Sequence, residues 1–218
     1  VDDYTDVTVV SVSGFNGGDS LALGGAYIWV GDQDTGWVYA LDPTTLATIT
    51  VKAAPGSGGT SAMIADATHL YVGSLTGKFW KLALSGYAVT GPVSLVSGYV
   101  HTMCEAGDYI YGHAQALGGS TATLFKVAKA DLTLTSSAAR AFAYHDDIWQ
   151  DATYFYIAKN HLLRVAKSNL GVTALALPLG TSEIDGFDDN GNYLLLNKSV
   201  QTPTQIIYLI DMTTYKHM

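Results

Sequence analysis

The sequence predicts an all-β domain built from a repeated four-stranded unit, and three observations support this. The stretch Ala26–Val51 alternates aromatic and β-branched runs with Gly-, Asp- and Pro-containing turns, which is typical of consecutive strands. It shows no apolar period of 3.6 residues, the pattern expected of an amphipathic helix. Weaker copies of the stretch follow along the remaining chain.

One marker position measures the spacing of the copies. The markers are Trp29, Tyr71, Tyr111, Tyr156 and Leu195. They recur about every 40 residues, and each unit contains four short strand candidates, which is typical of a propeller blade. The sequence therefore predicts a five-bladed β-propeller with four antiparallel strands in each blade. A β-sandwich is the alternative, because sandwiches also place short strands at regular intervals.

The predicted blades form a single domain over residues 1–218. Their approximate bounds are 18–52, 60–96, 100–138, 145–178 and 183–218. The alternating segment 6–13 resembles an outer strand, and we expect it to complete the last blade and close the ring, because an open ring would leave a strand edge exposed. A helical turn is expected only near 138–144.

Composition limits the partners. The net charge is −8, which argues against binding to a nucleic-acid backbone. No apolar run approaches the roughly 18–20 residues of a membrane helix, so we expect no membrane insertion. Only 14% of the residues are charged, which suggests an extracellular or virion surface. Cys104 is the only cysteine, and a packed thiol is the expected role for it.

Two stretches carry a resemblance to known repeats. Ala26–Val51 resembles the YVTN-type surface-layer repeat, with matching residues at Tyr27, Val30, Val38, Leu41, Asp42 and Ile49. Leu70–Leu82 resembles the quinoprotein repeat. The resemblance implies a propeller fold and a leaning towards binding or scaffolding. Those families are built largely from seven or eight blades, and the tryptophan-docking signature of quinoproteins is missing, so no quinone cofactor is expected.

A column of polar residues lies where the first strand of each unit begins. Its members are Asp19, Ser61, His101, Asp146 and Asp185. In a propeller the first strands line a central channel, so we expect these residues to gather in a ring. The ring has three interpretations: a water-filled channel mouth, a cation site, or a glycosidase centre.

The two chemical interpretations use different members of the column. Carboxylates of Asp19, Asp146 and Asp185 with water suit Ca²⁺, and His101 would also tolerate another divalent ion such as Zn²⁺. Glycoside hydrolysis needs one protonated and one ionised carboxyl group, for which Asp146 and Asp185 are the candidates, assisted by His101. No resident cofactor is required by either the sequence or the channel-mouth interpretation.

Two further side-chain patterns yield predictions. Trp37 follows a turn and has no aromatic counterpart in the other units, so it is the aromatic candidate for ligand binding. Lys81, Lys126 and Arg164 share one column, and we expect an exposed stripe at a strand edge.

The sequence thus favours a non-catalytic binding or structural module, extracellular or virion-associated and part of a larger assembly. Its expected partner is a glycan or a protein surface. The alternative is a glycoside hydrolase or metal-dependent hydrolase centred on the channel.

Overall fold

The structure, a computed structural model, describes eleven stretches of the chain. They are residues 18–53, 58–95, 98–116, 121–136, 140–141, 147–158, 162–175, 184–189, 193–198, 206–211 and 216–217. Within them the chain forms only strands, turns and bends, as the sequence predicts, and no helix with the length and apolar character to cross a membrane is found there.

These residues form five antiparallel sheets, numbered in chain order. Sheet 1 contains β1 (Gly18–Gly24), β2 (Tyr27–Asp32), β3 (Trp37–Leu41) and β4 (Thr48–Ala53). Sheet 2 contains β5 (Thr60–Ala65), β6 (His69–Ser74), β7 (Lys78–Ala83) and β8 (Val89–Ser94). Sheet 3 contains β9 (Gly98–Ala106), β10 (Tyr109–Ala116), β11 (Thr121–Ala128), β12 (Leu134–Ser136) and β13 (Arg140–Ala141).

The last two sheets have four strands each. Sheet 4 contains β14 (Asp147–Gln150), β15 (Tyr154–Ala158), β16 (Leu162–Ala166) and β17 (Val172–Leu175). Sheet 5 contains β18 (Ile184–Asp189), β19 (Tyr193–Lys198), β20 (Ile206–Asp211) and β21 (Lys216–His217). In every sheet the strands pair in the order in which they occur in the chain, except that β13 joins β11.

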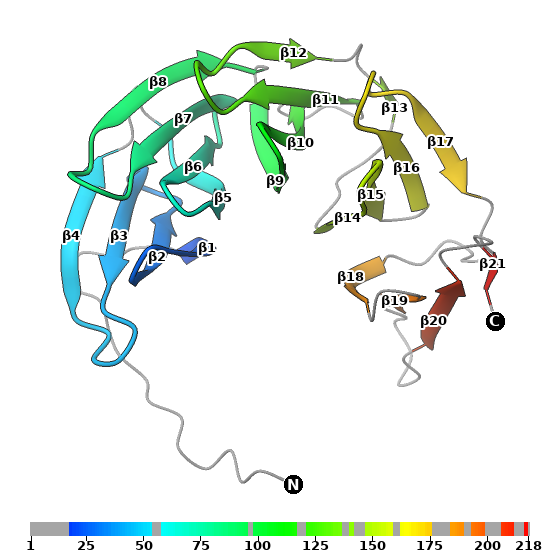
Figure 1. Cartoon of the computed structure of the whole chain (residues 1–218), viewed down its shortest axis with the longest axis horizontal. Helices are drawn as coiled ribbons and strands as arrows, with labels where there is room; N and C mark the ends of the chain where they lie inside the picture. The colour runs from blue at the N-terminus through cyan, green and yellow to red at the C-terminus, as the bar shows by residue number, and fades with distance from the viewer. Residues whose placement is uncertain are drawn as a thin grey trace, which may run out of the picture.

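The five sheets follow one another in an arc, with their first strands innermost (Figure 1). We call β1, β5, β9, β14 and β18 the inner strands. Each inner strand contacts the next one along the chain. No comparable contact joins β1 to β18 within the stretches that the structure covers, so the arc is open between sheets 5 and 1.

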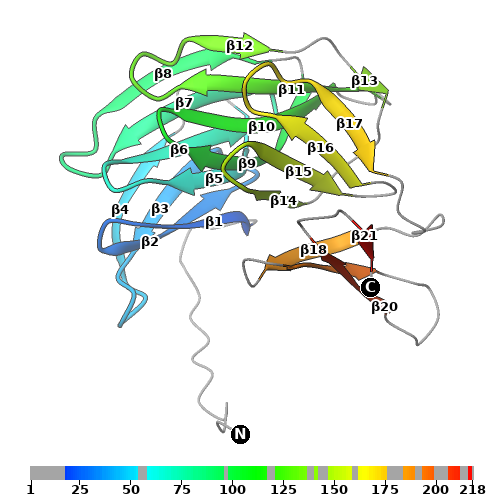
Figure 2. The ribbon, with the colours of Figure 1, turned by 45° about the vertical axis from the view of Figure 1, so that its right-hand side comes forward.

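The first four sheets stack face to face along the arc (Figure 2). Apolar side chains fill the spaces between sheets 1 and 2, between sheets 2 and 3, and between sheets 3 and 4. We call the side of a sheet that faces the next sheet its forward side, and the opposite side its rear side. The forward side of sheet 1 presents Trp29 to Leu70 and Trp80 on the rear side of sheet 2. Burying each such large side chain contributes about 1.5–3 kcal/mol, so these contacts hold neighbouring sheets together.

A left-handed residue recurs in the turn between the third and fourth strands. Leu46, Tyr87, Leu132 and Leu170 occupy the same position in sheets 1 to 4, with φ angles of 57°, 58°, 61° and 58°. This conformation is disfavoured for residues with a Cβ atom. The backbone N–H of Leu46, Leu132 and Leu170 donates to the carbonyl four residues earlier, which closes the turn. Burial of Leu132 and Leu170 offsets the strain.

The chain segments near residues 138–144 and 6–13 were predicted to form a helical turn and a closing strand. Arg140 and Ala141 form β13, paired with β11, so the helical turn expected near 138–144 is wrong at these two residues. Residues 6–13, predicted to close the ring, lie outside the described residues. β21 pairs only with Ile210 and Asp211 at the end of β20.

Candidate functional site at the start of the inner strands

The aligned polar column coincides with a β-bulge in the inner strands. In sheet 1, Gly18 pairs with Asp32 and Ser20 pairs with Gly31, so Asp19 is an extra residue without a partner in the ladder. The same irregularity places Ser61 between the paired residues of β5 and His101 between those of β9.

Asp185 occupies the same place in β18, between Ile184 and Gly186. A bulge bends its strand and redirects a side chain, and bulges are frequent beside functional sites. The sequence repeat places these four residues in one column, and in the structure each of them is the extra residue of a β-bulge. Asp146 and the side chains of Asp19 and Asp185 lie outside the described residues, so the ring of carboxylates remains a prediction.

We call the end of the arc at which the inner strands begin the start face. Its best-described part is in sheet 3, where the His101 ring stacks on His113, with centroids 5.2 Å apart and planes inclined by 4°. Tyr99 lies against His101 at 5.9 Å. His113 was not predicted from the sequence as a site residue, although it stands two residues after the marker Tyr111.

Glycine stands at the position of His113 in the first two sheets. A Cβ atom on Gly31 would lie 2.3 Å from Thr60 Oγ1, and one on Gly73 would lie 2.5 Å from Val100 Cγ1. Sheets 1 to 3 therefore approach closely at this level. The alignment of Gly31, Gly73 and His113 is the signal that could have marked the histidine.

Three hydroxyl groups lie buried near the same close approach. Ser20 Oγ, Thr60 Oγ1 and Ser61 Oγ have no hydrogen-bond partner among the residues that the structure describes. A buried hydroxyl without a partner is unfavourable by about 1–3 kcal/mol. The start face therefore offers neutral donors and acceptors beside the bulges.

A metal or hydrolase centre finds no support in the described side chains. Among them, no three His, Cys, Asp or Glu residues lie close enough together to hold a metal ion. Of the proposed ligands and acids, only His101 has a described side chain. Both chemical interpretations of the column thus remain predictions.

Trp37 begins β3, directly after a turn that is fixed by its own hydrogen bonds. Asp32 Oδ1 accepts from the N–H groups of Asp34 and Thr35 at 2.9 and 3.0 Å. The N–H of Gly36 donates to the Asp32 carbonyl at 3.0 Å. Trp37 is 46% exposed, so it is accessible, as a ligand-binding aromatic must be.

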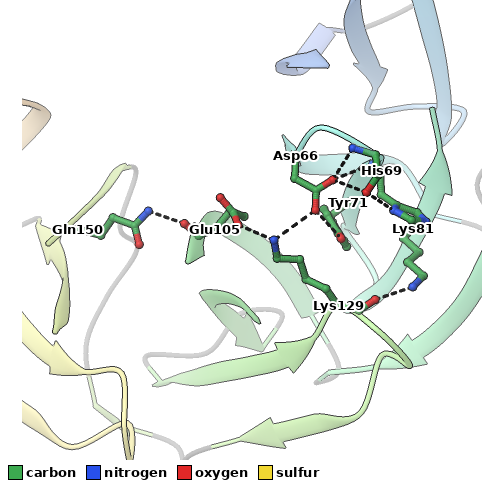
Figure 3. Close-up of polar contacts among 8 residues, drawn as sticks. Asp66, His69, Tyr71, Lys81, Glu105, Lys129 and Gln150 are labelled. Atoms are coloured by element: carbon green, nitrogen blue, oxygen red, sulfur yellow. Dashed lines mark hydrogen bonds and ion pairs between the residues drawn. The ribbon is translucent and has the colours of Figure 1, made fainter. Parts of the chain in front are cut away.

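The opposite end of the arc carries an ion-pair network that the sequence did not predict. We call it the end face, because the inner strands end there. Lys129 Nζ lies 3.2 Å from Asp66 Oδ2 in sheet 2 and 2.5 Å from Glu105 Oε1 in sheet 3 (Figure 3). Gln150 Nε2 of sheet 4 donates to the Glu105 carbonyl at 2.6 Å. The network thus connects three sheets.

Hydrogen bonds set the charge of this network. Burial alone would raise the pKa of Asp66, but donation from the N–H groups of Thr68 and His69 and from two hydroxyls lowers it well below the ordinary value of 3.8. One of those hydroxyls belongs to Tyr71, whose pKa is raised by burial and by its bond to Asp66. Burial also opposes the charge of Lys129, yet its bonds to Glu105 and Asp66 raise its pKa.

The lysine and arginine column does not form the exposed stripe that the sequence predicted. Lys81 is 7% exposed and donates to the carbonyls of Lys129 and Ala130 in the next sheet, at 2.5 and 2.9 Å. Lys126 and Arg164 are half-buried, and their cations lie 3.8 Å from the Tyr109 ring centroid and 4.6 Å from that of Tyr154. The prediction is wrong because carbonyls and aromatic rings serve as partners for these cations.

Sheet 4 places another lysine in the same turn as Lys129. Lys167 is buried and donates to the Asp151 carbonyl at 2.6 Å, and burial lowers its pKa. Its neighbour Cys104 is 5% exposed, and burial raises the pKa of this thiol to about 12. The predicted packed thiol is confirmed.

The two faces therefore differ in chemistry. At the end face, Lys129 forms ion pairs with both Asp66 and Glu105, and these pairs connect sheets 2 and 3. At the start face, the described groups near the bulges are the hydroxyls of Ser20, Thr60 and Ser61 and the stacked imidazoles of His101 and His113. The start face is the better candidate for ligand recognition.

Comparison with known proteins gives the fold but no family. No protein-family model and no curated protein sequence matches the chain. Among solved structures, it is similar to the computationally designed protein Ika8, with a TM-score of 0.72 and 11% identity over 92% of this chain and 60% of that one. It is also similar to the Kuenenia stuttgartiensis hydrazine synthase, with a TM-score of 0.68 and 12% identity over 89% of this chain and 64% of that one.

A third similar structure is the β-propeller domain of Cps50 (Swd1) from Myceliophteria thermophila. The TM-score is 0.66 and the identity 7%, over 92% of this chain and 72% of that one. The chain has a β-propeller type of fold. It spans less than two thirds of the length of the first two structures, and identities this low carry the fold alone.

Proposed function

We propose that the chain is a non-catalytic binding module that recognises a glycan or a protein surface at its start face. One observation carries this proposal: the inner strands of sheets 1, 2, 3 and 5 each place their aligned residue at a β-bulge. Those residues are Asp19, Ser61, His101 and Asp185. A β-bulge that recurs at the same strand position in several sheets is a built-in feature of the fold. Such a bulge redirects its side chain, and here we expect the redirected side chains to point towards the start face.

The frame proposed for this module is a five-bladed propeller whose ring is closed by residues 6–13. The five sheets and the recurring strand order support the blade count. Among the described residues, β21 pairs with Ile210 and Asp211 of β20, and the proposal assigns the rest of that edge to the closing strand. Rigid repeated sheets of this kind present binding faces more readily than deep catalytic clefts.

The side-chain types at the start face and the composition of the chain support a glycan or a protein surface as the partner. Hydroxyl, imidazole and indole groups suit a neutral glycan or the polar surface of a protein. The net charge of −8 disfavours nucleic acid. The low share of charged residues, 14%, supports display on an extracellular or virion surface as part of a larger assembly.

A glycan array and a panel of immobilised cell-surface proteins test the proposal. The wild type should bind, and His101→Ala and Trp37→Ala should each reduce binding at least tenfold. Val89→Ala, on the outer strand β8, serves as the matched control and should bind like the wild type. If the wild type binds neither panel, or if all three variants bind equally well, the start face is not a recognition surface.

A further inference from the structure

The end face holds one buried ammonium group that the ion-pair network does not include. Lys167 is 9% exposed, so water has little access to it. Its Nζ donates to the Asp151 carbonyl at 2.6 Å and lies 5.8 Å from the centroid of the Tyr111 ring. An ammonium group has three N–H donors, and the Asp151 carbonyl is the one acceptor that Lys167 Nζ has among the described residues. A buried charge without an opposite charge is unfavourable.

The carboxylates nearest to this ammonium group bind elsewhere. Glu105 Oε1 forms its ion pair with Lys129. The carboxylate of Asp151 accepts hydrogen bonds from two N–H groups and one hydroxyl of its own turn and strand. Neither carboxylate forms an ion pair with Lys167 in the described part of the chain.

The contact between sheets 2 and 3 shows what this position accepts. There Lys129, which stands in the turn of sheet 3 where Lys167 stands in sheet 4, has Asp66 Oδ2 at 3.2 Å (Figure 3). The residue of sheet 3 aligned with Asp66 is Ala106, which is shorter than aspartate by one carboxylate group. The contact between sheets 3 and 4 therefore repeats the lysine but not the carboxylate.

The second aligned position keeps its shape and loses its charge. Gln150 stands in sheet 4 where Glu105 stands in sheet 3, and the two side chains have the same length. Its Nε2 donates to the Glu105 carbonyl at 2.6 Å, which holds the two sheets together without a charge. Beside Ala106, the turn residues Gly107 and Asp108 are exposed, so this position borders the surface of the end face.

We infer that the contact between sheets 3 and 4 binds a carboxylate ligand at Lys167, in the position that Asp66 occupies beside Lys129. The ammonium group donates to the carboxylate with the N–H groups that the Asp151 carbonyl does not use. The ligand is a small monocarboxylate, either free or as the carboxyl group of a sugar acid. This site lies at the end face and does not depend on recognition at the start face.

A carboxylate suits the site better than a more highly charged anion. One ammonium group balances one negative charge, and the aligned contact at Lys129 shows that this turn accommodates carboxylate oxygens. Hydrogen bonds between an ammonium group and a carboxylate are stronger than bonds between neutral groups. The net charge of −8 disfavours an anion with further charge, such as phosphate.

Binding has two measurable consequences. Burial lowers the pKa of Lys167, and a bound carboxylate raises it again because it favours the charged form. A ligand that binds the folded state alone also stabilises that state in proportion to its occupancy. The side-chain signals of Lys167 are therefore the direct reporter of the site.

Nuclear magnetic resonance of the lysine side chains in the full chain tests the inference. Acetate and glucuronate are titrated separately at constant ionic strength, with chloride as the anion control and glucose as the neutral control. Both carboxylates should shift the Lys167 signals saturably and raise the pKa of this lysine, whereas chloride and glucose should not. Lys52, on the outer strand β4, should show no saturable shift. The variant Lys167→Met assigns the signals.

A carboxylate added to the protein should compete with the ligand. Ala106→Asp restores the missing group beside Lys167 and should weaken acetate binding roughly tenfold or more. Thr48→Asp, at an exposed position of β4, adds the same charge elsewhere and is the matched control, which should bind like the wild type. If Ala106→Asp fails to fold, Lys167→Met gives the second test, because a protein without this ammonium group should lose the saturable change in thermal stability with acetate.

The two carboxylates distinguish the sources of the ligand. Tighter binding of glucuronate assigns the site to a sugar acid, and binding of acetate alone assigns it to free monocarboxylates. Two outcomes overturn the inference: a Lys167 shift that neither carboxylate saturates or that chloride reproduces, and acetate binding that Ala106→Asp leaves unchanged.

Discussion

Two lysines in the same turn of neighbouring sheets behave in opposite ways. Lys129 of sheet 3 and Lys167 of sheet 4 each lie three residues before the left-handed leucine of their turn. Hydrogen bonds to carboxylates raise the pKa of Lys129 in spite of burial, whereas burial lowers the pKa of Lys167. The fold gives both residues the same position, so the difference must come from their neighbours.

The neighbours differ at two aligned positions. Lys129 meets Asp66 from the preceding sheet and Glu105 from its own. For Lys167 the corresponding positions hold Ala106 and Gln150, neither of which carries a charge. The repeat therefore supplies the place for a connection between sheets, and the local residues decide whether an ion pair forms there.

The largest expected effect comes from removing the lysine that has both carboxylates. Lys129→Met should lower the free energy of unfolding by about 2–3 kcal/mol, because it leaves Asp66 and Glu105 partly buried without their cation. Urea denaturation measures this change in the free energy of unfolding. Lys167→Met is the matched control at the same position of the next sheet. Equal losses in both variants would contradict the comparison.

Asp66→Asn should lower the free energy of unfolding by about 1–2 kcal/mol. Asp151→Asn is the control, because Asp151 caps the same turn in sheet 4 and accepts from Thr153, Tyr154 and Tyr156, but Lys167 donates to its carbonyl and not to its carboxylate. The excess loss in Asp66→Asn over this control reports the lysine contact. No excess would show that the ion pair contributes nothing.

The pKa of Asp66 predicts the acid response of the protein. The folded-state pKa lies below the ordinary value of 3.8, so the ionised group stabilises the fold above that pH. This contribution is lost as the pH falls from about 4 towards the folded-state pKa. Urea midpoints at pH 7 and pH 3 should therefore differ less in Asp66→Asn than in the wild type. Identical differences would contradict the assignment.

Lys167→Met should change the free energy of unfolding by less than about 1 kcal/mol, and in the stabilising direction. It replaces a buried ammonium group, which forms no ion pair with a carboxylate among the described residues, with an apolar chain of similar length. The sign follows from the lowered pKa, because burial of the charged form opposes folding at neutral pH. A loss as large as that of Lys129→Met would refute this.

The smallest expected effect comes from restoring the missing carboxylate. Ala106→Asp should raise the pKa of Lys167 and stabilise the fold by about 0.5–1 kcal/mol. A double-mutant cycle with Lys167→Met isolates the new pair from other effects of the aspartate. A coupling energy of zero would mean that the aligned positions do not bring these two side chains together.

Much of the fold follows from the sequence because strand composition and turn residues repeat. The marker residues Trp29, Tyr71, Tyr111 and Tyr156 all lie in second strands, and their recurrence predicted the sheets. The left-handed leucines were not predictable, because the backbone conformation at Leu132 or Leu170 depends on burial that the sequence does not display. The blade count and the closing strand remain predictions.

The candidate site was predicted in part. Alignment placed Ser61 and His101 in one column, and the structure shows why, since each is the extra residue of a bulge. The end-face network was missed because Asp66, Glu105 and Lys129 belong to different strands and turns, and the alignment treated each as an isolated polar residue. The burial of Lys81 was not predicted for a related reason. Its partners are backbone carbonyls, which every residue has, so the sequence does not distinguish them.

The central claim is that the repeat determines where Lys129 and Lys167 lie, whereas their neighbouring side chains determine the pKa of each lysine. Titration of the two lysine side chains by nuclear magnetic resonance tests this claim most directly. The Nζ groups of Lys129 and Lys167 are followed from neutral to alkaline pH, with assignments from the two methionine variants. The account predicts a pKa above the ordinary 10.5 for Lys129 and below it for Lys167. Equal values, or the reverse order, would contradict it.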